Sequence, residues 1–478
     1  MSKRYFITTT IPYVNAPPHI GFALELLQAD VIARYRRLRG ADVRLQTGTD
    51  ENAFKNVLSA RARGVPVEHL VDENAARFRS LAKVLDISID QFLRTTSGVH
   101  RNAVSAFLTR LRSGDLYRQS YEGLYCAGCE DFYLAGDLEN GRCPEHNVAP
   151  IAVAEENVFF RLSRYQSALR DLVTSRRLRI VPESRAIEVL RFIERGLVDI
   201  SISRDAGRSE GWGIPFPDDS SQVVYVWIDA LINYLSGLGY PDGERVAEHW
   251  RDATKIHFIG KNVWKFHAVY WPALLLSAGL SLPDQIVVHG FLTNEGRKIS
   301  KSSGDAVDPA DYVRRVGADG VRYFLLGHVR PFEDCDFSVE RLEAAYEADL
   351  ANGLGNLVSR TTALCEAAGV AGSSASGPWA APADYHEHLG AFRFDLALAP
   401  IWSEITRLNR EIAATKPWED VKAGRLTTAQ AKLLPVVDRL AAVGYWLAPF
   451  LPSTSQAIRE QLSQTLIRKG RPLFPRRS

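Results

Sequence analysis

The start of the chain follows a pattern that few folds can use. Residues 4–10 alternate and are rich in β-branched and aromatic types, which predicts a strand. Apolar residues then recur every three or four positions from 24 to 38, which predicts a helix that ends at Gly40. A second strand is predicted over 43–46. Strand, helix and strand in this order form a βαβ unit, which predicts an α/β fold with a doubly wound parallel sheet.

Composition excludes several classes of protein. The 478 residues predict about three domains, and 46% hydrophobic with 24% charged residues is typical of a globular chain. A net charge of +2 is too close to zero for the overall charge to point to a nucleic-acid partner, so any such contact would have to be local. The sequence has no run of 18 apolar residues and its first residues lack a signal-peptide pattern, so we expect a cytoplasmic protein without a membrane partner.

Shifts in composition divide the rest of the chain. Residues 121–149 are dense in Gly, Cys and acidic residues, which predicts a small loop-rich insertion. Strand-like segments at 223–228, 257–260 and 286–290, with a helical segment at 264–279, predict that the parallel-sheet domain then resumes. From Glu340 onward the patterns are helical. The predicted divisions are 1–117 and 223–290 for the two halves of the sheet domain, 118–222 for the insertion, 291–345 for a connecting region and 346–478 for a helical bundle.

A phosphate-binding motif is predicted where the first helix begins, in PPHIGFA (17–23). His19 would stand beside unpaired backbone N–H groups, where it can donate to a phosphate during adenylyl transfer, while Gly21 allows close approach of a nucleotide. Taken alone, the motif is more often a helix-capping loop with a solvated histidine, so the functional interpretation depends on its context.

A second motif, GRKISKSSG (296–304), follows the last predicted strand of the sheet domain. Lys298 and Lys301 lie on a glycine-flanked loop, which suits a mobile clamp on a polyphosphate, although a solvated surface turn would look the same. An HIG helix start combined with a later KxSKS loop is the two-part signature of class I aminoacyl-tRNA synthetases.

The chain resembles the methionine–tRNA ligase family from end to end, in segments such as FITTTIPYVNAPPHIG, LQTGTDE, YVWIDALINY, FIGK, KISKS and PLFPR. The resemblance implies a Rossmann-type catalytic domain, ATP with Mg²⁺, methionyl-adenylate formation and transfer to the 3′ end of tRNA in protein biosynthesis. It implies a monomer, because the chain ends after PLFPR without a dimerisation module. The implied ATP-binding residues are His19, Gly21, Asn262, Lys298, Ser300 and Lys301, of which His19, Lys298 and Lys301 would be catalytic.

The insertion carries a predicted zinc site. Cys126 and Cys129 form a CxxC pair, and Cys143 and His146 form a CxxH pair, with 13 residues between the two pairs. Three thiolates and an imidazole fit a closed tetrahedral zinc site that would hold together a segment lacking its own core. A redox CxxC would not need His146, and chance cysteines would have to explain both half-sites. We therefore expect structural zinc.

The resemblance also implies an amino-acid site and an anticodon site. Asp50 would pair with the substrate ammonium, and aromatic and aliphatic walls would suit a thioether; taken alone, Trp227 and Ala230 fit ordinary core packing. Arg and Asn side chains with a Trp ring can read unpaired bases, although a structural role would explain them as well. The implied amino-acid residues are Ile11, Tyr13, Asp50, Trp227, Ala230, Leu231, Tyr234, Val263 and His267, and the implied anticodon residues are Asn356, Arg360 and Trp418.

Three motifs depart from the family pattern. Phe22 replaces a polar residue, commonly a second histidine, and cannot donate; TDEHG becomes Thr-Asp-Glu-Asn52-Ala53; and Asn262 stands where aspartate is common. Besides the ligase, two functions therefore stay open. One is a paralogue that passes an activated amino acid to a small acceptor, for example in N–N bond formation with a cupin partner. The other is a non-catalytic RNA-binding relative, which the intact KISKS loop disfavours.

Overall fold

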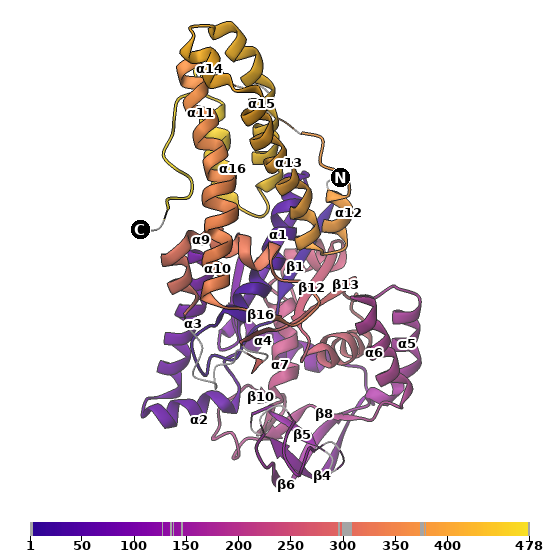
Figure 1. Cartoon of the computed structure of the whole chain (residues 1–478). Helices are drawn as coiled ribbons and strands as arrows, with labels where there is room; N and C mark the ends of the chain where they lie inside the picture. Colours follow the sequence, from indigo (N-terminus) through magenta and orange to yellow (C-terminus); the bar gives the residue numbers. More distant parts are fainter. Residues whose placement is uncertain are drawn as a thin grey trace. The chain divides into compact units, whose positions relative to one another are not determined.

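A computed structural model of the chain describes all residues except 1–2, 127, 134–135, 137, 145–146, 295–296, 299–307, 373–376, 378 and 477–478. The chain divides into two compact units, which are described separately (Figure 1). Unit 1 comprises Met1–Ala29, Gly40–Ala82 and Ile89–His289, and unit 2 comprises Asp30–Arg39, Lys83–Ser88 and Gly290–Ser478.

A six-stranded parallel sheet forms the centre of unit 1, with the strand order β3-β2-β1-β12-β13-β7. Its core residues, such as Phe6 and Phe258, are fully buried because helices cover a parallel sheet on both faces. The predicted doubly wound α/β fold is confirmed. The strands are β1 Arg4–Thr9, β2 Asp42–Thr49, β3 Gln91–Arg94, β7 Arg179–Val181, β12 Thr254–Gly260 and β13 Gln285–His289.

The chain order places a topological switch point between β1 and β12. From β1 the chain builds outward to β2 and β3, whereas β12 and β13 extend the sheet in the other direction, so their connections leave a crevice at the carboxyl ends of β1 and β12. The helices of unit 1 are α2 Phe54–Arg63, α4 Gly98–Arg110, α5 Gln166–Thr174, α6 Glu183–Glu194, α7 Val226–Ser236 and α8 Trp271–Ala278, preceded by the π-helical turn η4 Phe266–Tyr270. Helices α1 Ile20–Leu38 and α3 Val67–Val84 contribute residues to both units.

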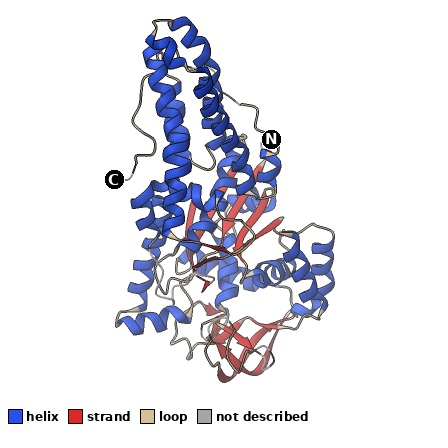
Figure 2. Ribbon diagram, viewed as in Figure 1, coloured by secondary structure: helices blue, strands red, loops and turns tan. Residues whose placement is uncertain are grey.

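Two antiparallel sheets make up the inserted part of unit 1, visible as the lower group of strands in Figure 2. One has the order β5-β4-β6-β8 and the other β10-β11-β9. Their strands are β4 Leu116–Cys126, β5 Asp131–Tyr133, β6 Ile151–Phe160, β8 Ile200–Ser201, β9 Ser203–Asp205, β10 Pro215–Phe216 and β11 Asp219–Val224.

Two details differ from the sequence prediction. The strand expected over 223–228 is wrong, because β11 ends at Val224 in an antiparallel sheet and α7 begins at Val226. Nearly every residue of α7 is buried, so the helix has no polar face to reveal its period. The three-residue strand β7 lies within the predicted insertion but pairs with β13 in the parallel sheet. A strand this short carries no readable alternation.

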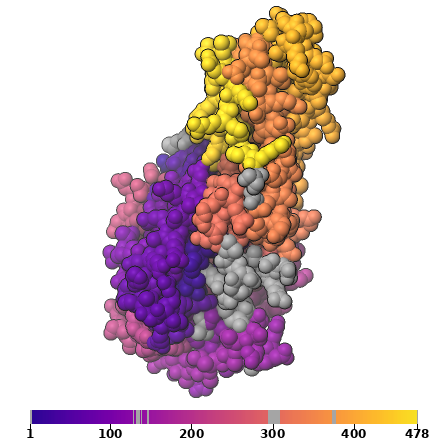
Figure 3. Space-filling view, turned by 60° about the vertical axis from the view of Figure 1, so that its left-hand side comes forward, coloured from indigo at the N-terminus to yellow at the C-terminus, as the bar shows by residue number. Residues whose placement is uncertain are grey.

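Unit 2 is helical after residue 340, and the described residues there form no strand, as expected. Its small sheet has the order β15-β14-β16. Orange and yellow mark the C-terminal residues in the space-filling view of Figure 3. The elements are β14 Leu292–Asn294, β15 Arg297–Lys298, α9 Pro309–Gly327, β16 Cys335–Asp336, α10 Val339–Ala345, η5 Tyr346–Gly355, α11 Asn356–Ala368, α12 Tyr385–Gly390, α13 Phe394–Thr415, α14 Pro417–Lys422, α15 Leu426–Leu447 and α16 Pro452–Leu462. In the part of the chain that the structure describes, no helix has both the length and the apolar character needed to cross a membrane.

Candidate active site

His19 caps the first helix at the switch-point crevice. Its carbonyl accepts the backbone N–H of Phe22 at 3.0 Å, and its side-chain Nδ1 accepts the N–H of Gly21 at 3.1 Å. Because Nδ1 accepts, the neutral ring carries its proton on Nε2, where it is a donor suited to a phosphate oxygen. A Cβ at Gly21 would lie 3.0 Å from this imidazole, so the position favours glycine.

Glu25 ties the carboxyl ends of two strands together beside this helix start. Its Oε1 accepts the backbone N–H of Thr10, just after β1, at 2.7 Å, and its Oε2 lies 2.8 Å from Nε2 of His289 at the end of β13. The carboxylate is 4% exposed. A buried charge with partners on both sides holds the edge of the crevice in one arrangement.

Asp50 is a buried carboxylate at the end of β2. It forms a backbone bridge with Tyr13 of the loop before α1 and is 1% exposed. Its Oδ1 has no hydrogen-bond partner among the described residues. Burial, followed by repulsion from Asp229 and Glu130, raises the pKa of Asp50 well above its ordinary value. A substrate ammonium next to Oδ1 would supply both the missing donor and the opposite charge.

An aromatic group lies beside this carboxylate. The Trp227 ring, in the first turn of α7, stacks on Phe266 with 4.1 Å between centroids and 7° between planes. Tyr13 lies 5.7 Å from Trp227 at a tilt of 55°. These flat apolar faces from three separate segments form a wall that suits the side chain of an apolar amino acid.

Tyr234 and His267 form the polar end of the same group. The Tyr234 hydroxyl donates to Nε2 of His267 at 2.8 Å, while Nδ1 of His267 donates to the carbonyl of Val263 at 2.9 Å. Burial lowers the pKa of His267 to about 4, so the imidazole is neutral near pH 7 and can accept the tyrosine proton. The structure thus brings these three predicted residues together; Ile11, Ala230 and Leu231 are buried in the same unit.

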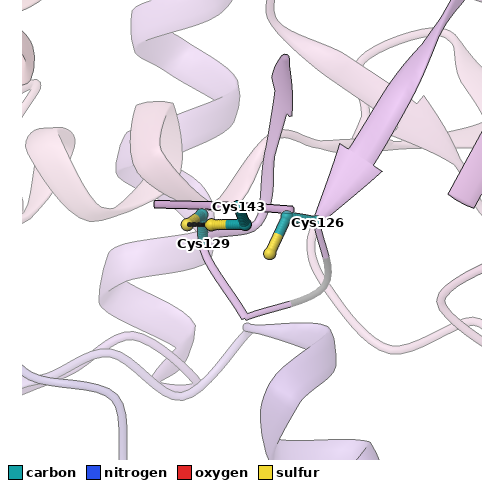
Figure 4. A group of neighbouring side chains, drawn as sticks. All are labelled: Cys126, Cys129 and Cys143. Atoms are coloured by element: carbon teal, nitrogen blue, oxygen red, sulfur yellow. Dashed lines mark hydrogen bonds between the residues drawn. The ribbon is translucent and has the colours of Figure 1, made fainter. Parts of the chain in front are cut away.

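Three cysteines of the insertion converge, as Figure 4 shows. The sulfur atoms of Cys126, Cys129 and Cys143 all lie within 4.8 Å of one another. Zinc–sulfur bonds of about 2.3 Å in a tetrahedron require sulfurs about 3.8 Å apart, so these residues fit the metal. Cys129 and Cys143 are 3.4 Å apart. The predicted fourth ligand, His146, lies outside the described residues.

The predicted anticodon residues belong to two helices of unit 2. Asn356 is exposed at the start of α11, and Arg360 lies one turn later with Nη2 at 3.2 Å from the carbonyl of Asn409. Trp418 is half-buried at the start of α14, which packs against α11. The three side chains therefore come from neighbouring elements.

The structure describes only part of the second phosphate motif, residues 296–304. Lys298 ends β15, which pairs with β14 in antiparallel orientation, and Ser300 and Lys301 lie outside the described residues. Asn262 is exposed in the turn after β12.

Known proteins resemble this chain over nearly its whole length. The family described as "tRNA synthetases class I (M)" matches residues 5–149 and 133–362. The methionine–tRNA ligase of Thermosynechococcus vestitus is 40% identical over 98% of this chain and 91% of its own, and that of Thermotoga maritima is 38% identical over 96% and 75%. The chain belongs to the methionine–tRNA ligase family. A structure of Mycobacterium tuberculosis methionyl-tRNA synthetase in complex with methionyl-adenylate matches with a TM-score of 0.91 at 34% identity, covering 99% of this chain and 100% of that one.

The residues that depart from the family pattern have defined surroundings. Phe22 is 7% exposed and packs edge-on against Phe78 with 5.2 Å between centroids, so its ring belongs to the core. Asn52 donates to Oδ2 of Asp229 at 2.7 Å, and the other oxygen of Asp229 lies 2.5 Å from Nε2 of His100. Asn52 thus supplies a hydrogen-bond donor to a buried carboxylate and fastens the loop after Asp50 to α7.

Analysis of the sequence missed several residues of this candidate site. Asp229 could have been found, because a carboxylate inside the apolar segment YVWIDALINY is rarely buried without a role. Phe266 gives no signal beyond its apolar surroundings. Glu130 is tied to Lys55 across 75 positions of sequence, a separation that no local pattern reveals.

Replacing Cys126 with Ser is expected to remove bound metal, because it deletes one of three converging sulfurs. The purified wild-type chain should contain about one zinc per molecule and the variant well under half of that. Metal analysis after gel filtration is the measurement. Cys335→Ser, which changes a half-buried cysteine of unit 2, is the matched control and should keep the metal. A wild-type chain purified without zinc would contradict the assignment.

Proposed function

We propose that this chain activates methionine with ATP and transfers it to the 3′ end of tRNA. The observation that carries the proposal is the buried Asp50 carboxylate, bridged to Tyr13 of the aromatic wall, in a chain of the methionine–tRNA ligase family. The carboxylate binds the ammonium group, and the wall receives the thioether side chain.

In the first step the methionine carboxylate attacks the α-phosphorus of ATP, and pyrophosphate leaves. His19 donates from Nε2 to a phosphate oxygen, and Lys298 and Lys301 neutralise charge on the polyphosphate. Gly21, Ser300 and Asn262 contact the nucleotide, and Mg²⁺ accompanies ATP. In the second step a 3′-terminal hydroxyl of tRNA attacks the carbonyl carbon, and AMP leaves. Bound zinc would supply a structural cross-link through Cys126, Cys129, Cys143 and His146 and no step of the reaction.

Charging of bulk tRNA with labelled methionine and Mg-ATP tests the proposal, with methionine-dependent pyrophosphate exchange measured beside it. Charging and exchange are both expected. Exchange without charging would favour the paralogue with a small-molecule acceptor and a cupin partner, which the changes at Asn52 and Asn262 motivate. Absence of activity in both the charging assay and the exchange assay would favour a non-catalytic relative. The cytoplasmic location, the monomeric state and the domain boundaries stay predictions from the sequence.

Trp418→Ala is expected to weaken tRNA charging and to spare adenylate formation. Stacking of one base on an aromatic ring contributes about 1–3 kcal/mol, so kcat/KM for tRNA should fall about 5- to 150-fold. Pyrophosphate exchange should be unchanged, since Trp418 belongs to unit 2 and the residues of the proposed amino-acid site belong to unit 1. Trp379→Ala, another half-buried tryptophan of unit 2, is the control. Normal charging by the Trp418 variant would contradict the assignment of Trp418 to the anticodon site.

A further inference from the structure

The CxxC loop holds two segments that lie outside the insertion. The backbone carbonyl of Cys129 accepts the indole N–H of Trp227 at 3.2 Å. The side chain of the next residue, Glu130, accepts the backbone N–H of Lys55 at 2.7 Å. One short loop therefore fixes the start of α7 and the start of α2.

Burial, backbone conformation and two hydrogen bonds hold the Glu130 side chain in this position. It is 5% exposed, its φ of 56° is unusual for a residue with a side chain, and its second oxygen accepts the Tyr125 hydroxyl at 2.6 Å. Helix α2 begins after Ala53, whose side chain cannot cap it. Glu130 supplies the missing cap from the insertion, and a carboxylate at a helix N-terminus is also favoured by the helix dipole.

Both held segments belong to the proposed amino-acid site. Trp227 is fixed at its N–H edge by the loop and at its face by Phe266, so its ring has one orientation. Helix α2 is fastened to the Asp50 loop, because Nδ2 of Asn56 donates to the carbonyl of Glu51 at 2.9 Å. A shift of α2 would therefore move the residues that follow β2.

We propose that Glu130 is a positioning residue for amino-acid binding: with the Cys129 carbonyl, it holds Trp227 and the Asp50 loop in their binding arrangement. This inference rests on the proposed function. Since Cys129 is also a candidate metal ligand, metal binding would fix the same loop, and the insertion would stiffen the amino-acid site from outside.

Glu130→Ala is the decisive variant, with Glu130→Gln as the conservative one and Glu139→Ala as the control. The amide oxygen of Gln still accepts the Lys55 N–H, whereas Glu139 is an exposed acid of the same insertion. We expect Glu130→Ala to raise the KM for methionine about tenfold with the KM for ATP changed by less than about twofold. Gln should restore most of the methionine affinity, and Glu139→Ala should behave as wild type.

Trp227→Phe provides a second, independent variant if Glu130→Ala folds poorly. It keeps a ring against Phe266 and loses the N–H that Cys129 accepts, so the KM for methionine should rise as well. Both variants weaken the contacts that the Cys129–Glu130 loop makes with the amino-acid site. The KM for methionine of the double variant should therefore rise by less than the product of the two single effects.

Binding without turnover separates positioning from activity. Equilibrium dialysis of methionine in the absence of ATP should show weaker binding after the metal is removed from the wild-type chain, and a smaller further loss in Glu130→Ala. An unchanged methionine KM in Glu130→Ala, or equal rises for methionine and ATP, would overturn the inference and leave a purely structural role. Absence of methionine-dependent exchange in the wild type would instead contradict the proposed function.

Discussion

Asp50→Asn is expected to weaken methionine activation strongly while making the folded chain more stable. The variant keeps the shape of the side chain and removes the charge that would pair with the substrate ammonium. Loss of a buried, charge-assisted contact made to the reacting substrate predicts a fall in kcat/KM for methionine of about 100- to 1,000-fold. Pyrophosphate exchange at varied methionine concentration is the measurement.

The gain in stability follows from the sign of the pKa shift. Burial first, and then Asp229 and Glu130, raise the pKa of Asp50, so ionising this carboxyl costs more free energy in the folded chain than in the unfolded chain. Above the ordinary pKa of aspartate, folding therefore works against the ionised carboxylate. Asparagine has no charge to bury, so the melting temperature near pH 7 should rise by about 1–3 °C.

The same shift predicts how methionine binding depends on pH. The KM for methionine of the wild type should rise as the pH falls through the raised pKa of Asp50, because a protonated carboxyl cannot pair with an ammonium group. Asp242→Asn, an exposed aspartate of unit 1, is the matched control and should change neither activity nor stability. Full activity of Asp50→Asn, or a lower melting temperature, would contradict this account.

Arg322→Met is expected to have the largest effect on stability. Arg322 and Asp30 are both 0% exposed within unit 2, with Nη2 at 2.7 Å from Oδ2. The guanidinium also donates to the backbone carbonyls of Phe450 at 2.6 Å and Leu85 at 3.1 Å. Removing it takes from the Asp30 carboxylate its fully buried cationic partner, although Arg34 remains, and takes a donor from buried carbonyls, a loss of about 3–5 kcal/mol in the free energy of unfolding.

The pH dependence of this loss is set by Asp30. Burial alone would raise its pKa, but Arg322, Arg34 and two hydrogen bonds from Ser88 outweigh burial and lower it. The stabilisation is therefore complete above the ordinary pKa of aspartate and is lost as the pH falls through the lowered folded-state value. Urea unfolding of wild type and variant at neutral and acidic pH should show the difference shrinking on acidification.

Two further variants test whether the pair acts as a unit. Combining Arg322→Met with Asp30→Leu should be less destabilising than the sum of the single changes, because neither charge is then left buried alone. Arg314→Met, an exposed arginine of the same helix, should change stability by less than about 0.5 kcal/mol. A small effect of Arg322→Met would show that water or another cation replaces the guanidinium.

The sequence by itself determined the features that depend on neighbouring residues. The βαβ start was predicted because alternation in 4–10 and the three-to-four spacing up to Gly40 are local, and β1 and α1 confirm it. The spacing of Cys126 and Cys129 likewise predicted a cluster that the structure shows. Where a segment is buried all round, as in α7, the local pattern vanishes and the expected strand was wrong.

Only the tertiary structure decided which of these residues come into contact and how each contact changes a pKa or the orientation of a side chain. Resemblance named Asp50 and Trp227, but a raised pKa needs Asp229 and Glu130 beside the buried carboxylate, and a fixed indole needs the Cys129 carbonyl. Glu130 and Lys55 are 75 residues apart, so their contact depends on how the turn between β4 and β5 packs against the start of α2. Burial and electrostatic energies depend on distances in space, and these are set by packing rather than by sequence order.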